Sequence, residues 1–303
     1  MSIARVGTLM LAAAIVAGCH GESVTPPALP ASATAAAPRA SWKLPKTSEQ
    51  VLWSLAGDAY AYTLDGTQVA VIGGFNNADG ICTDPTGDVY ITDSDLVYAY
   101  APGASLPFYI YDDTGQQASS CAFDPATGNL AVANSANLTI FPPASGTPIA
   151  FTTPNMTSYS YLNFDKTGNL YVDGYGAKNS FQLAELPKGS GSLVSVKLPG
   201  INNRTHRPGG LVWDGQDVAI SDGLNDVIYR ISISGSSGTV LNSYHIPNWR
   251  RHFTPVFAIL GKRLFFPIDG KVEFFSWPPK GGRAKNGFFG HIGSLTIGPE
   301  VIN

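Results

Sequence analysis

The sequence predicts an all-β fold, a single six-bladed β-propeller over residues 47–303, and three observations lead to that prediction. A short apolar phrase with a turn at its centre recurs along the chain. Its copies are spaced at the length of a four-stranded propeller blade. The two ends of the region supply complementary strands of one further blade, which would close the ring and remove exposed sheet edges. We therefore expect the last blade to combine a C-terminal strand with N-terminal strands.

The composition of the 303-residue chain agrees with one globular domain, because 44% of the residues are hydrophobic and 14% are charged. Gly (33) and Pro (22) are abundant, and Asp outnumbers Glu, as in turn-rich β structure where Asp hydrogen-bonds to its own turn backbone. The formal net charge of -3 provides no bulk attraction to nucleic acid, so we expect no nucleic-acid partner. A monomer is expected.

The N-terminal residues 1–19 are predicted to be an export signal. Arg5 gives a positive start, and residues 6–17 form an apolar stretch that is short for a membrane span. The segment ends in Val16-Ala17-Gly18-Cys19, which resembles the bacterial lipobox. That resemblance implies that the Cys19 thiol is acylated and the preceding peptide removed; the alternative is an ordinary signal peptide with an incidental Cys. The lipid would hold the exported protein to a membrane of the cell envelope.

Two further observations concern the anchor. His20 stands where an Asp would resemble an inner-membrane retention signal, which favours the outer membrane or the periplasmic side. Residues 20–46 are rich in Pro, Ala, Ser and Thr with hardly any apolar periodicity, and are predicted to be a semi-extended tether.

The recurring phrase consists of two short apolar runs around a turn, which is the pattern of a β-hairpin. Its four clear copies and one degenerate copy span residues 80–93, 120–134, 161–173, 210–222 and 256–269. The central turn falls at Asp84, Asp124, Asp165, Asp214 and Gly261, and successive differences are 40, 41, 49 and 47 residues. A third and a fourth apolar run follow each hairpin, for example at 96–100 and 108–111. Each repeat therefore predicts one four-stranded blade.

The closing blade is predicted from the two ends of the region. Residues 294–300 look like a first strand without successors, whereas 51–55, 59–64 and 68–72 look like second, third and fourth strands without a first. The recurring phrase resembles the NHL repeat, and residues 48–303 resemble the six-bladed propellers of the NHL and gluconolactonase-like group. This resemblance implies the fold. It does not select a function, because such propellers include scaffolds, binding proteins and hydrolases.

The gluconolactonase-like resemblance implies one candidate metal ligand. Ser221-Asp222-Gly-Leu-Asn-Asp226 looks like the segment that carries that family's metal-binding Asp, which would be Asp222. The family's expected Asn-Gly is replaced by Gly209-Gly210, and no Glu lies between Glu49 and Glu185 to supply an early carboxylate. No nucleophile elbow of the G-x-S-x-G type is present, so the catalytic residues are unknown.

Cys82 and Cys121 occupy the first strands of neighbouring predicted blades. An exported protein meets oxidising conditions, so we predict a disulfide between them. The alternative is two small buried residues, since their repeat positions differ by one and the bond requires Cα atoms within roughly 7 Å.

We define the corner residues as the polar residues at the ends of the predicted second strands. They are Asp93, Asn134, Asp173, Asp222 and Asp269. Repetition would arrange them as a ring of oxygens around one channel mouth, where Ca²⁺, the candidate cofactor, favours such ligands. The alternative is that each accepts backbone N–H bonds and fixes its own turn.

Cationic and aromatic residues gather in the connections that enter the last three blades. They are His206, Arg207, Trp249, Arg251, His252 and His291. In one sector of the mouth they could recognise an anionic or carbohydrate-like group. The alternative is that they are solvated surface residues, which could pair with the corner residues beside them. The sequence thus predicts a lipid-anchored binding or scaffold module with an envelope protein or glycan as partner. The alternative function is a metal-dependent, lactonase-like hydrolase at the channel mouth.

Overall fold

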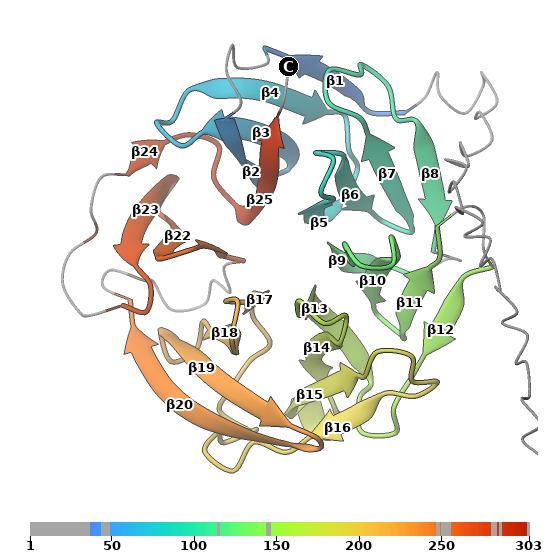
Figure 1. The fold of residues 1–303 in the computed structure, drawn as a ribbon, viewed down its shortest axis with the longest axis vertical. Coiled ribbons are helices and arrows are strands. Elements are labelled where there is room, and N and C mark those ends of the chain that lie inside the picture. The colour runs from blue at the N-terminus through green and yellow to red at the C-terminus, as the bar shows by residue number, and fades with distance from the viewer. Residues whose placement is uncertain are drawn as a thin grey trace, which may run out of the picture.

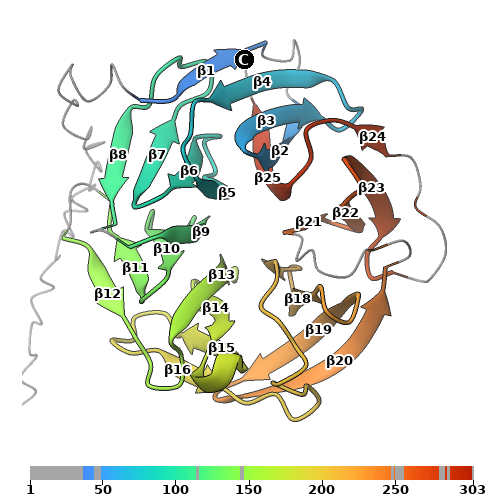
Figure 2. The same cartoon turned by 180° about the vertical axis from the view of Figure 1, so that it is seen from behind.

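The computed structural model describes residues 37–43, 49–113, 116–143, 147–246, 249, 256–279, 284 and 287–301. Six antiparallel sheets stand around a central axis like the blades of a propeller (Figure 1). The view from behind shows the same ring (Figure 2). The predicted all-β, six-bladed propeller is confirmed.

Five blades have four strands each, ordered along the chain from the axis to the rim. The innermost strands are β5 (Ala78–Thr83), β9 (Ala118–Phe123), β13 (Ser158–Phe164), β17 (Leu211–Trp213) and β21 (Ala258–Leu260). The second strands are β6 (Val89–Asp93), β10 (Leu130–Asn134), β14 (Leu170–Tyr175), β18 (Val218–Asp222) and β22 (Arg263–Ile268). The third strands are β7 (Leu96–Tyr100), β11 (Leu138–Phe141), β15 (Phe181–Leu186), β19 (Val227–Ser234) and β23 (Lys271–Ser276). The outermost strands are β8 (Tyr109–Asp112), β12 (Ile149–Phe151), β16 (Val194–Val196), β20 (Ser237–His245) and β24 (Phe288–Phe289).

The sixth blade joins the two ends of the chain in the order β25, β2, β3, β4, β1. These strands are β25 (Ser294–Val301), β2 (Glu49–Ala56), β3 (Asp58–Thr63), β4 (Gln68–Gly73) and β1 (Arg39–Trp42). β25 takes the innermost place and pairs antiparallel with β2, so that Leu52 lies opposite Ile297. The predicted closure by one C-terminal and three N-terminal strands is therefore confirmed.

β1 is the one strand of this blade that lies within the segment predicted to be a tether. It pairs with the outer edge of β4, with Arg39 opposite Gly73. The Trp42 indole donates to the Ala104 carbonyl at 2.7 Å and packs edge-on against Trp53, with ring centroids 5.5 Å apart. The tether region therefore supplies a fifth strand, because β4 has a free edge and Trp42 has an apolar site to fill.

The repeated turn Asp residues fold the inner hairpins. Asp84 Oδ1 accepts the N–H groups of Thr86 and Asp88, both at 2.9 Å, and Asp165 Oδ1 does the same for Thr167 and Asn169 at 2.8 and 2.9 Å. Burial alone would raise the pKa of Asp165, but these bonds and the side chains of Thr167 and Asn169 hold the pKa below its ordinary value. An Asp at the hairpin turn thus recurs along the sequence because the inner hairpins need the same tight turn.

The two faces of the ring differ in the turns that they carry. We call the face with the second-to-third strand turns the corner face, and the face with the first-to-second strand turns the hairpin face. The core lies between neighbouring blades, where fully buried side chains such as Phe181, Phe265 and Leu52 pack. One short 3₁₀ helix, η1 (Ala177–Asn179), joins β14 to β15. None of the helices in the described ranges has the length and apolarity needed to span a bilayer.

Candidate functional site

The central channel holds a cavity of about 250 Å³. Residues from the innermost strand of every blade line it, among them Thr83, Ser120, Asn163, Trp213 and Thr296. The buried indole N–H of Trp213 has no hydrogen-bond partner within the described ranges. The channel lining therefore combines polar groups with apolar side chains such as Leu162 and Phe257.

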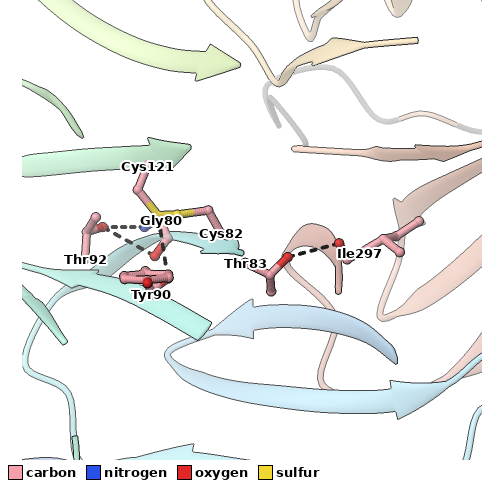
Figure 3. Close-up of a disulfide and its surroundings, with 7 residues drawn as sticks. All are labelled: Gly80, Cys82, Thr83, Tyr90, Thr92, Cys121 and Ile297. Atoms are coloured by element: carbon pink, nitrogen blue, oxygen red, sulfur yellow. Dashed lines mark hydrogen bonds between the residues drawn. A yellow bond between two sulfur atoms is a disulfide. The ribbon is translucent and has the colours of Figure 1, made fainter. Parts of the chain in front are cut away.

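The predicted disulfide is present in the channel wall (Figure 3). Cys82 of β5 and Cys121 of β9 have Cα atoms 5.6 Å apart, and the bond joins the innermost strands of two neighbouring blades. Gly80 makes the close approach possible, because a Cβ at this position would lie 2.6 Å from the Ser120 Cα. On the other side, the Thr83 hydroxyl donates to the Ile297 carbonyl at 3.1 Å. β5 is thus bonded to the innermost strand of the neighbouring blade on each side, β9 and β25.

Two corner residues hold loops of the corner face within their own blades. Asp93 accepts the N–H groups of Asn76 and Asn77, at 3.1 and 2.5 Å, and so holds the connection that enters its own blade. Asn134 Oδ1 accepts the Ala136 and Asn137 N–H groups at 2.9 and 2.7 Å. Both side chains are buried. Their oxygens face their own loops.

Asp173 is fully buried and links two blades. Its Oδ1 accepts the Tyr161 N–H at 2.9 Å, and its Oδ2 accepts the Gly209 N–H, in the next blade's entry, at 3.1 Å. Burial raises the pKa of Asp173 well above its ordinary value, although both N–H groups oppose that rise. Asp269 differs from the other corner residues: it is exposed and lies in the left-handed region with φ of 49°.

Asp222 is fully buried and lies beside His206, with His206 Nδ1 2.8 Å from Asp222 Oδ2. Asp222 also accepts the Leu224 N–H at 3.0 Å and the Asn225 amide. Burial alone would raise the pKa of Asp222, but His206, Asn225 and the Leu224 N–H together lower it. The His206 ring packs edge-on against Phe181 with centroids 4.1 Å apart, and its Nε2 has no hydrogen-bond partner in the described part of the chain.

The remaining cationic and aromatic candidates do not form one cluster among the described residues. Trp249 is 7% exposed and packs edge-on against Phe266 at 4.8 Å. His291 is exposed and stacks on Tyr60, with centroids 4.3 Å apart. Arg207 is exposed and opposes the rise in the pKa of Tyr175 that burial causes. The other predicted site residues, Cys19, Arg251 and His252, lie outside the described residues.

In the described ranges, no group of three or more His, Cys, Asp or Glu side chains is arranged to hold a metal ion. Sequence reasoning allowed that loop His and Arg side chains pair with the corner residues, but it did not single out the contact of His206 with Asp222. The two residues are 16 positions apart, and neither the turn motif nor the strand period indicates which side chains meet across a blade entry. The one available signal was that His206 stands in an entry loop directly before the blade of Asp222.

Comparisons with known proteins identify the fold and no family. No family model and no curated protein matches the sequence. A chain of the nidogen/laminin complex matches the structure with a TM-score of 0.64 and 12% identity, over 84% of this chain and 99% of that one. A Bacteroides caccae protein of unknown function matches with 0.61 and 15%, over 84% and 99%. Virginiamycin B lyase from Staphylococcus aureus matches with 0.53 and 16%, over 71% and 73%.

Proposed function

We propose that this chain is an exported propeller, anchored to a membrane through lipid on Cys19, which binds a partner or ligand and does not act as a metal-dependent hydrolase. One observation carries the proposal. Four of the five corner residues direct their side-chain oxygens to backbone N–H groups and are buried, namely Asp93, Asn134, Asp173 and Asp222. Side chains in this arrangement fix loops.

A metal at the corner face would have to displace these bonds. Asp222, the residue that the lactonase resemblance implies as a ligand, already contacts His206, Asn225 and the Leu224 N–H. Freeing its carboxylate would leave the buried His206 ring, the half-buried Leu224 N–H and the Asn225 amide without this acceptor, and a buried donor that loses its acceptor costs about 1–3 kcal/mol. The similar folds include a chain from a nidogen/laminin complex and a virginiamycin B lyase, so fold likeness alone supports binding and catalysis equally.

Thermal unfolding with and without Ca²⁺ tests the choice between binding and metal chemistry. A Ca²⁺ site held at about 100 times its Kd would stabilise the fold by about 2.7 kcal/mol, roughly 5–10 °C in Tm. We expect no such rise, and no hydrolysis of sugar lactones in the presence of Ca²⁺. A rise that disappears in Asp222→Asn but persists in the control variant Asp79→Asn would contradict the proposal and favour the hydrolase.

The anchor is tested separately by replacing the predicted lipid-bearing residue. Cys19→Ala is expected to move the protein from the membrane fraction to the soluble fraction and to remove the lipid mass from the mature N-terminus. The double variant Cys82→Ala/Cys121→Ala is the control, because it also removes thiols but leaves Cys19. Unchanged membrane retention of Cys19→Ala, with no acyl group detected on wild-type Cys19, would refute lipid anchoring.

A further inference from the structure

A second cavity, of about 610 Å³, lies on the hairpin face between the β21–β24 blade and the closing blade. Lys262 and Arg263, at the β21–β22 turn, line one part, and Leu64 and Asp65, which follow β3, line another. We call it the hairpin-face pocket. Its volume is more than twice that of the channel cavity and falls within the range of pockets for small molecules. No predicted site residue lines it.

Aromatic rings form the apolar walls of the hairpin-face pocket. Phe274 and Phe288 are half-buried and meet nearly edge-on, with centroids 6.0 Å apart. Phe288 also packs against Tyr62 at 5.2 Å. Gly66 leaves room for that ring, because a Cβ at this position would lie 2.6 Å from the Phe288 Cβ. The rings are therefore held in place while part of their surface is accessible to a ligand.

The pocket also carries two exposed cations. Lys262 and Arg263 are exposed, and neither side chain has an ion pair or hydrogen bond in the described part of the chain. Other cations of the neighbouring strands are paired: Arg230 contacts Asp214 at 2.6 Å, and Lys271 contacts Glu273. In a chain with a formal net charge of -3, two cations that have no partner among the described residues and lie beside an aromatic cavity favour an anionic ligand.

Asp65 adds a hydrogen-bond acceptor to the lining of the pocket. Its Oδ1 accepts the Thr67 N–H at 3.1 Å and the Thr63 hydroxyl. The Thr63 and Thr67 bonds lower the pKa of Asp65, so this carboxylate is ionised at neutral pH. A ligand that carries both a carboxylate and hydroxyl groups would satisfy the cations and the acceptor together, and its C–H face would pack on the rings.

We propose that the hairpin-face pocket binds an acidic sugar, with the carboxylate of a uronic acid at Lys262 and Arg263, its ring against Phe274 and Phe288, and a hydroxyl donated to Asp65. Binding here is independent of the corner face and of metal, so a failure of this proposal leaves the proposed function intact.

Titration calorimetry of the mature full-length protein tests the site with four probes: a diglucuronate, the matched neutral disaccharide, benzoate and inorganic phosphate. We expect saturable binding of the diglucuronate, at least roughly tenfold tighter than that of each other probe. Tighter binding of benzoate would overturn the sugar assignment in favour of an aromatic acid, and equal binding of phosphate would reduce the pocket to a surface of positive charge.

Variants then locate the binding. Lys262→Gln/Arg263→Gln is expected to weaken diglucuronate binding at least roughly tenfold. The control Lys188→Gln/Arg204→Gln removes the same charge from exposed cations elsewhere and is expected to change nothing. Ser276→Trp, which places a bulky ring at the exposed pocket wall, is expected to block binding without removing charge. Diglucuronate binding of equal strength in all three variants, or none in wild type up to about 10 mM, would refute the proposal.

Discussion

The corner residues and the hairpin-face pocket use charge in opposite ways. Asp93, Asp173 and Asp222 recur at one repeat position, are buried, and accept N–H groups from the loops around them. Lys262 and Arg263 are exposed and have no partners within the described ranges, and Arg263 has no cationic counterpart in the other repeats. Residues that recur in this propeller therefore maintain the ring, and a ligand site is better sought where a blade departs from the repeat.

The largest expected effect concerns the bond that maintains the ring covalently. Removing the disulfide with Cys82→Ala/Cys121→Ala frees a loop with a sequence separation of 39 residues. By chain entropy this costs about 4 kcal/mol of unfolding free energy, measurable by urea titration. In reductant, the unfolding free energy of the wild type should equal that of the variant without reductant. Reductant should not change the unfolding free energy of the variant. A loss below about 1 kcal/mol would mean that the packing of β5 against β9 is stable without the disulfide.

The next effect separates a buried corner residue from a surface acid. Asp173→Ala leaves the Tyr161 and Gly209 N–H groups without acceptors, so we expect a loss of about 2–4 kcal/mol in the same titration. Asp79→Ala is the matched control. Among the described residues its partners are the Asn77 and Gln117 side chains, and a loss within about 0.5 kcal/mol is expected. Equal losses in the two variants would contradict the claim that the buried Asp173 stabilises the fold more than a surface carboxylate does.

The pH dependence of stability tests whether the ionised carboxylate of Asp222 also stabilises the fold. Its folded-state pKa is lower than the ordinary 3.8, so its contribution is present above that value and is lost as the pH falls through the folded-state pKa. Wild type should therefore exceed Asp222→Asn in stability at neutral pH, and the difference should shrink in acid below 3.8. Urea titrations from neutral to acid pH measure it. A difference that grows on acidification would contradict the role assigned to Asp222.

The smallest effect on stability is expected in the hairpin-face pocket. Lys262→Gln/Arg263→Gln removes no described ion pair, so the unfolding free energy should change by less than about 0.5 kcal/mol. The same urea titration checks this. A loss of several kcal/mol would show that these cations serve the fold, as the corner residues do.

The fold could be predicted from the sequence because its main device is local and repeated. The turn Asp residues, such as Asp84 and Asp165, bond to N–H groups two and four positions away, so the turn is visible in any short window. β1 was not predicted, since Arg39–Trp42 lies in a Pro- and Ala-rich segment and its pairing partner, β4, becomes available only after the blade has formed.

The sites depend on contacts between distant segments, which the repeat does not encode. Leu64 and Phe288 line one pocket although more than 200 positions separate them, because ring closure brings the first and last blades together. Trp249 was predicted at the channel mouth on its residue type, but it packs against Phe266 in the core. Residue type alone does not distinguish an aromatic ring that contacts a ligand from one that fills the space between blades.

One measurement tests most directly whether the corner residues serve the ring rather than a ligand. The unfolding free energies of wild type and of Asp93→Ala, Asn134→Ala, Asp173→Ala and Asp222→Ala are compared by urea titration with and without Ca²⁺. We predict that every variant loses about 1–4 kcal/mol and that the losses are the same in both conditions. Wild-type stability that rises with Ca²⁺, together with corner variants that lose this rise, would contradict the account.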